Sequence, residues 1–195
     1  MRTRTTVVAV MLLGATATAC SGTTGDEAPT AATGAAGTPT ASVGGGAGTG
    51  PLRIGTGRHW IDIDTDGSPI SATTTVLGYT QPAKGVGLPD KAADFSDPVW
   101  ATLEVKVCAD SDSTNVMVGQ TPWSLGFADD TRLAAPGLSG SGVPKPEYPA
   151  DGAAVTPGTC LRGKITYALE KDTRPDQVIY GVEGRDPIEW AIPKA

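Results

Sequence analysis

The 195-residue chain has little of several residue types that common functions require. It contains a single His, which excludes most His-dependent catalysis and multi-His metal sites. Its net charge of -6 at pH 7 argues against nucleic-acid binding, which requires a basic face. No apolar run approaches the roughly 20 residues of a membrane-spanning helix. The 26 Gly and 16 Pro interrupt helices, so long helical bundles and coiled coils are excluded as well.

What the chain does have is an N-terminus with the layout of a secretory signal peptide. Arg2 and Arg4 precede an apolar run from Val7 to Ala15, and small residues then lead to Cys20. Residues 1–19 are therefore predicted to be a signal peptide. The rest of the chain is expected to be exported.

The predicted cleavage position, Ala17-Thr18-Ala19-Cys20, resembles the lipobox of bacterial lipoproteins, with Ala17 where that family usually has Leu. The resemblance implies that Cys20 is diacylated and holds the protein at the extracytoplasmic face of the cell membrane, because two acyl chains suffice for stable anchoring. The same residues also fit an ordinary A-x-A cleavage site. That alternative releases a secreted, soluble protein with a free Cys.

Residues 20–52 are predicted to form a disordered tether that begins at the lipidated Cys. From Ser21 to Pro51 the chain is almost entirely Gly, Ala, Thr, Ser and Pro, with Val43 as its only larger apolar residue. Such a segment buries too little apolar surface to offset its ordering entropy. We interpret it as a plain spacer with a mean span of roughly 30 Å, and glycosylation of its Thr and Ser residues stays open.

Residues 53–195 are predicted to be an all-β domain, an immunoglobulin-like β-sandwich. Short apolar runs with period-two alternation recur between turn residues, and no window shows a helical period. The Gly- and Pro-rich connection 131–157 is interpreted as a mobile loop. Strands are expected at 58–64, 70–80, 99–108, 114–119, 122–127, 159–169, 177–183 and 187–192.

About 95 residues at the C-terminal end resemble a known family. The segment Trp100–Cys108 is followed by Trp123, by Pro157–Tyr167 and by Trp190. This order is similar to the telokin-like, immunoglobulin-type sandwich of secreted actinobacterial proteins, which include lipoproteins of uncharacterised function. The residues that match the family pattern are Gly163, Ile165, Tyr167, Pro175, Val178, Tyr180, Trp190 and Ile192. The resemblance implies an immunoglobulin-like sandwich on the outer cell surface and supplies no reaction.

Cys108 and Cys160 are expected to form a disulfide, because they remain as a pair once Cys20 is assigned to lipid and an exported protein meets an oxidising environment. Alternation places both on the polar faces of their strands. A link between neighbouring strands on an outer face is therefore expected rather than a buried pin between sheets. Two unpaired thiols are the alternative.

Asp62, Asp64 and Asp66 form the D-x-D-x-D-G pattern that begins a calcium-binding loop. The acidic residue that should close such a loop is missing, since Thr73 occupies that position. We interpret the segment instead as a strand with Asp62 and Asp64 on its solvent-exposed face, followed by an Asp-Gly turn. Calcium binding stays open.

The remaining candidates for chemistry are isolated. His59 has no identifiable nucleophile or carboxylate partner, and Ser139 and Ser141 do not meet the G-x-S-x-G pattern. Two acidic pairs lie in segments typical of turns: Asp110 with Asp112, and Asp129 with Asp130. No catalytic residue, metal ligand or cofactor is predicted.

Among the four Trp residues, Trp190 is in step with neighbouring Ile residues and is predicted to lie in the core. Trp100 is out of step with Val99 and Ala101, so it is expected to face outward or to lie under a loop.

The sequence thus predicts a non-catalytic binding or interaction module, anchored at the cell envelope, and not an enzyme. Its expected partners are the membrane, through the lipid, and another envelope protein or a wall component, with no nucleic acid. An extracytoplasmic solute-binding protein, or an enzyme whose site forms no motif, is the alternative. A calcium-stabilised adhesion module is a further one.

Overall fold

The computed structural model describes residues 50–83, 95 and 97–194, all within the unit Gly46–Ala195. Cys20, the predicted signal peptide and nearly all of the predicted tether lie outside these residues. Within the described ranges the chain forms strands and turns, and it has no helix that could cross a membrane. The strands are β1 (Leu52–Arg53), β2 (Gly57–Ile63), β3 (Pro69–Thr80), β4 (Pro98–Ala109), β5 (Val116–Val118), β6 (Trp123–Gly126), β7 (Arg132–Ala134), β8 (Ala153–Val155), β9 (Cys160–Glu170), β10 (Gln177–Tyr180) and β11 (Ile188–Ala191).

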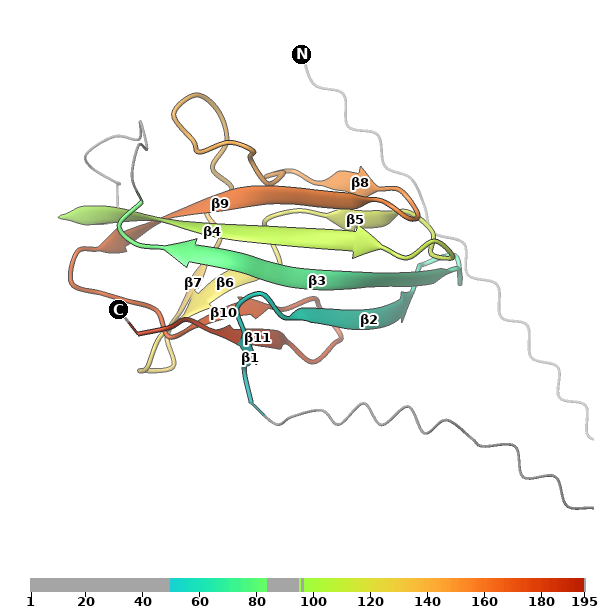
Figure 1. Ribbon diagram of the computed structural model, residues 1–195, viewed down its shortest axis with the longest axis horizontal. Coiled ribbons are helices and arrows are strands. Elements are labelled where there is room, and N and C mark those ends of the chain that lie inside the picture. Colours follow the sequence, from blue (N-terminus) through green and yellow to red (C-terminus); the bar gives the residue numbers. More distant parts are fainter. Residues whose placement is uncertain (1–49, 84–94, 96, 195) are drawn as a thin grey trace, which may run out of the picture. The chain divides into compact units, whose positions relative to one another are not determined.

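Two sheets form a sandwich, with the longer strands in one layer and the shorter ones behind them (Figure 1). The first sheet has the order β2-β3-β4-β9 and is antiparallel throughout. The second has the order β1-β11-β10-β6-β7, in which the two-residue β1 runs parallel to β11. Strands β5 and β8 pair separately. The predicted all-β sandwich is therefore confirmed.

The core lies between the sheets and follows from the alternation of the long strands. In β4 every second residue from Ala101 to Val107 is fully buried, and Ile165 and Tyr167 of β9 face the same side. Trp123 of β6 and Trp190 of β11 close the core from the other sheet, with ring centroids 6.0 Å apart. Fully burying an aliphatic side chain contributes roughly 1.5–3 kcal/mol. The predicted core position of Trp190 is confirmed.

The connection 131–157 differs from its prediction as a loop. It contains β7 and β8, and it places Val143 and Tyr148 in the core. The Tyr148 ring packs edge-on against Trp123, with centroids 6.3 Å apart. Gly and Pro prevent long strands in this segment, but they do not prevent one large aromatic residue from reaching the core between them.

The part of this connection near Tyr148 also closes one edge of the first sheet. Tyr148 N donates to the Lys164 carbonyl of β9 at 3.0 Å, and Lys164 N donates to the Pro146 carbonyl at 2.8 Å. The contact is close because Gly163 has no side chain: a Cβ there would lie 2.5 Å from Tyr148 N. The other edge strand of this sheet is β2.

Candidate binding groove at the open edge of the sandwich

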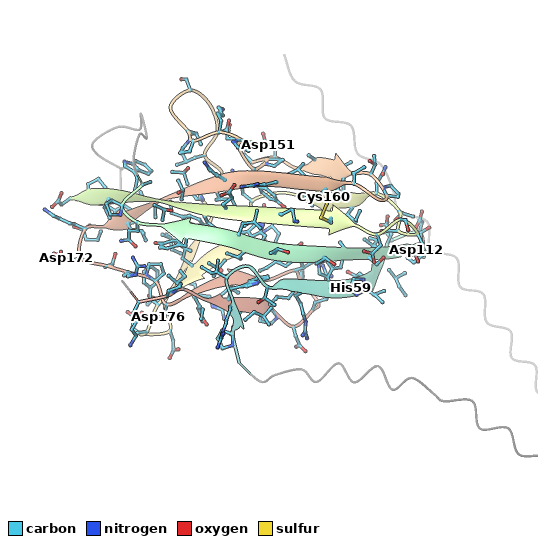
Figure 2. The ribbon with its side chains drawn as sticks, in the orientation of Figure 1. His59, Asp112, Asp151, Cys160, Asp172 and Asp176 are labelled. Atoms are coloured by element: carbon cyan, nitrogen blue, oxygen red, sulfur yellow. A yellow bond between two sulfur atoms is a disulfide. The ribbon has the colours of Figure 1, made fainter. Side chains whose placement is uncertain are left out.

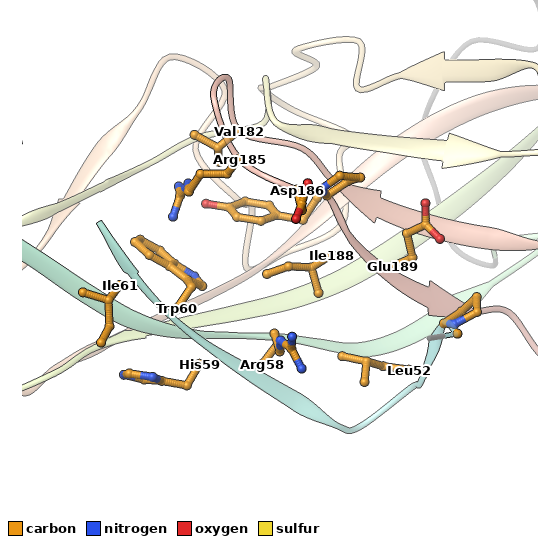
Figure 3. A pocket seen from close by; sticks show the side chains of 14 residues that line it. Leu52, Arg58, His59, Trp60, Ile61, Val182, Arg185, Asp186, Ile188 and Glu189 are labelled. Carbon is orange, nitrogen blue, oxygen red and sulfur yellow. The ribbon is translucent and has the colours of Figure 1, made fainter. Parts of the chain in front are cut away.

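A groove of about 630 Å³ runs along β2 (Figure 3). One wall is β2 itself, with Trp60 and Ile61. The opposite wall is the segment between β10 and β11, with Val182 and Ile188, and Leu52 of β1 lies at one end. The groove thus lies where the two sheets part, and it brings together segments about 130 residues apart in the chain.

The edge of β2 that faces the groove has unpaired backbone groups. On β3, the carbonyls of Pro69 and Ser71 accept hydrogen bonds from the β4 side, from Thr114 N and Asp110 N. The backbone N–H and C=O groups of the even-numbered residues of β3 therefore point toward β2. They form hydrogen bonds with the even-numbered residues of β2. The N–H and C=O groups of Gly57, His59 and Ile61 point away from the sheet, and within the described part of the chain they have no partner.

Trp60 and Arg185 link the two walls at the mouth of the groove. The guanidinium Cζ of Arg185 lies 4.3 Å from the centre of the Trp60 ring (Figure 3). Trp60 Nε1 donates to Thr74 Oγ1 at 2.8 Å. Asp62 Oδ2 completes the arrangement, 3.4 Å from Arg185 Nε. A cation over an aromatic face contributes about 0.5–2 kcal/mol, more where water is excluded.

The predicted facing of β2 is wrong. Asp62 lies on the same side of the strand as Trp60, directed at Arg185, whereas Ile61 and Ile63 face the solvent and are 69% and 70% exposed. Burial of the larger Trp60 ring decides the facing. The same orientation places the Asp62 carboxylate on the inner side of the strand, where Arg185 neutralises it. Two exposed Ile residues on one face of an edge strand are the opposite of what a surface strand usually presents.

His59 does have a carboxylate partner. Its Nε2 donates to Asp110 Oδ2 at 2.7 Å, on the outer face of the first sheet. Hydrogen bonds from the side chains of His59 and Ser71 hold the pKa of Asp110 below its usual value. Both donors converge on the carboxylate, so the order is Ser–Asp–His. A catalytic triad requires the His between nucleophile and carboxylate, and this arrangement does not supply a nucleophile.

Cys108 and Cys160 form the predicted disulfide. They lie directly opposite each other on β4 and β9, with Cα atoms 4.0 Å apart. Figure 2 shows the bond between sulfur atoms beside the labelled Cys160. Both side chains lie on the outer face of the sheet, as the alternation predicted.

The acidic pattern near β2 forms a turn. Gly67 N donates to the Asp64 carbonyl, and Ser68 N donates to Asp66 Oδ1 at 3.0 Å, which lowers the pKa of Asp66. Gly67 has φ +84°, a conformation that favours Gly. Across the residues that the structure describes, no three His, Cys, Asp or Glu side chains are arranged to hold a metal ion.

The turns predicted at the two acidic pairs are also present. In the first, Ser113 N donates to the Asp110 carbonyl at 3.2 Å. Asp129 accepts from both the backbone N and the hydroxyl of Thr131, and these bonds lower its pKa.

No family model and no curated protein matches the chain. A solved structure does match: the secreted protein MPT63 of Mycobacterium tuberculosis, with 18% sequence identity and a TM-score of 0.52. The match covers 74% of this chain and 99% of that protein. This chain folds as an immunoglobulin-like β-sandwich. At this identity the likeness concerns the fold alone.

The groove could not be found from the sequence. Its walls are Gly57–Ile63 and the segment after β10, and neither carries a motif. The sequence offered one signal. Trp60 and Asp62 alternate with two Ile residues, so both faces of the predicted strand contain apolar residues.

Proposed function

We propose that this protein is a non-catalytic interaction module, anchored through lipid on Cys20 at the extracytoplasmic face of the cell membrane. The open edge of β2 is the observation that carries the proposal. It combines unpaired backbone groups, two exposed Ile side chains and a groove beside them. Strand addition to such an edge is a recurring mode of protein recognition.

Extracytoplasmic location is supported by the signal-peptide pattern before Cys20 and by a disulfide in the folded domain. The fold is also that of a secreted mycobacterial protein. The predicted tether, with a mean span of roughly 30 Å, would let the domain reach partners in the envelope while the lipid keeps it at the membrane.

The test is a photo-crosslinking amino acid at position 61 of the full-length chain in intact cells. Position 117 is the matched control, because Met117 is 67% exposed against 69% for Ile61 and lies on β5. We expect one or two recurring adducts from position 61 and none of them from position 117. Equal capture at both positions, or none at 61, would contradict the binding role. Cys20→Ala should move the chain out of the membrane fraction, and retention there would contradict the anchor.

A further inference from the structure

We infer that the partner at this edge is a second copy of this chain, joined by antiparallel pairing of β2 with β2 so that Trp60 faces Trp60. The inference rests on the proposed function, because it names the partner of the same edge. It follows from the order of charges along β2 and from the positions of its free backbone groups.

The sequence of β2 is complementary to itself when read in the opposite direction. Trp60 is the middle residue of the strand Gly57–Ile63, Arg58 lies two positions before it and Asp62 two positions after it. In an antiparallel pair centred on Trp60, each Arg58 therefore lies opposite Asp62 of the second copy. Opposite charges placed in this way stabilise a strand pair, and like charges destabilise it.

The same register uses the free backbone groups. It sets His59 opposite Ile61 of the second copy, twice by symmetry. Both residues direct their N–H and C=O groups away from β3, so each of these pairs exchanges both of its hydrogen bonds. In a register shifted by one residue, backbone groups that are already hydrogen-bonded to β3 would lie opposite the free backbone groups of the second copy. The two-fold axis passes between the Trp60 residues, which form a non-hydrogen-bonded pair.

Exposed apolar surface is covered by the same pairing. Each Ile61 packs beside His59 of the second copy, and each Ile63 lies over Gly57, which has no side chain in the way. Both Ile side chains are otherwise more than two-thirds exposed. The groove beside the edge leaves space for a strand to approach, and Arg185 of the opposite wall lies over the Trp60 ring.

Inward-facing charges on an edge strand normally oppose edge-to-edge pairing. On β2 they are opposite in sign and symmetric about Trp60, so they oppose other registers and favour this one. Arg58 is available for it, since it has no ion-pair partner among the residues that the structure describes. Asp62 has a partner in Arg185 but keeps 41% of its side chain exposed.

The chain's own tether fits this edge less well. Its charges are Asp26 and Glu27, both acidic and adjacent, and it has no Arg or Lys from Ser21 to Pro51. If one of these acidic residues lies opposite Arg58, the tether therefore has no basic residue that could lie opposite Asp62. Only a segment with both charges four residues apart matches the edge, and β2 itself is such a segment.

Pairing through one seven-residue strand buries little area, so we expect a weak dimer. Anchoring of both copies to one membrane through Cys20 would raise their effective concentration toward the millimolar range. The dimer is thus expected to form at the membrane and to dissociate on dilution of the soluble chain.

Sedimentation equilibrium of the mature chain, kept soluble by Cys20→Ser, tests this. We expect a concentration-dependent dimer that Arg58→Asp or Asp62→Arg alone weakens by about tenfold or more. An equimolar mixture of the two variants should restore association, because positions 58 and 62 then carry opposite charges in both of the facing pairs. A chain that stays monomeric at about 1 mM, or a mixture that does not recover, overturns the inference.

Asp62→Arg also removes the ion pair with Arg185, so a second variant protects the test from a folding defect. Ile61→Lys alters only an exposed side chain and should weaken the dimer by about tenfold or more, whereas Met117→Lys, of equal exposure, should not. Equal effects of the two substitutions would overturn the inference. Crosslinking of position 61 to another protein or to the tether, with a monomeric purified chain, overturns the second-copy inference and leaves the interaction module standing. Absence of both crosslink and dimer overturns both.

Discussion

Gly163→Ala should be the most damaging small substitution in the domain. The new Cβ would lie 2.5 Å from Tyr148 N and 2.6 Å from the Glu147 carbonyl carbon and oxygen. Backbone atoms cannot rotate away as the end of a side chain can, so the segment around Tyr148 must move off β9. Two backbone hydrogen bonds to Lys164 are then lost or weakened.

The cost can be estimated from these contacts. Each lost hydrogen bond contributes about 1 kcal/mol, and overpacking adds about 1–3 kcal/mol. The reduced entropy of the unfolded chain returns about 0.4–1 kcal/mol, as for any Gly→Ala change. We therefore expect the free energy of unfolding to fall by about 2–5 kcal/mol, measured by urea denaturation.

Gly181→Ala is the matched control, because a Cβ there meets nothing within 4 Å and the residue does not have a positive φ. Its stability should stay within about 1 kcal/mol of the parent. Equal stability of the two variants would refute the reasoning, since it would mean that residues 146–148 do not lie against β9.

Two further predictions concern stability. Removing the disulfide by Cys108→Ser with Cys160→Ser should lower the free energy of unfolding by about 4 kcal/mol in the chain-entropy model, because the bond joins residues 52 positions apart. A denaturation midpoint that is the same with and without reductant would contradict this. Burial raises the pKa of all four tyrosines, Tyr79, Tyr148, Tyr167 and Tyr180. The unfolded chain releases these protons near pH 10, so stability is complete below about pH 10 and falls above it, by up to about 1.4 kcal/mol per pH unit for each of the buried Tyr148 and Tyr167. Ultraviolet titration should show no tyrosinate before unfolding, and ionisation near pH 10 in the folded chain would contradict the burial.

The long strands could be predicted because their patterns are local and unambiguous. In β4, five apolar residues alternate with Trp, Thr, Glu, Lys and Cys, so one face must be buried whatever lies around it. The same alternation placed Cys108 and Cys160 on an outer face, where the structure has them joined. Each of these inferences needs only the period of the strand and the polarity of its residues.

Features that depend on distant partners could not be predicted in this way. Burial of Trp60 decides the facing of β2, and it depends on Arg185, more than 120 residues further along the chain, which covers the Trp60 ring and neutralises Asp62. Tyr148 is buried because Trp123 lies beside it, although it belongs to a segment rich in Gly and Pro. Short elements such as β1 have too few residues to show a period at all.

One edge of the first sheet is covered by another segment of the chain and the other edge is exposed. This difference favours a binding role for the exposed edge strand, β2. An exposed edge strand can pair with other chains, so stable domains usually have short edge strands, place charged residues on them or cover them. The β9 edge is covered by residues 146–148, at a position where Gly163 allows the backbones to touch. The β2 edge is seven residues long, has no Pro and no Lys, and exposes Ile61 and Ile63. Its two charged residues would suppress pairing if they were alike. Because they are opposite and equally spaced from Trp60, they select a partner strand instead, and a chain that only had to avoid association would not need that symmetry.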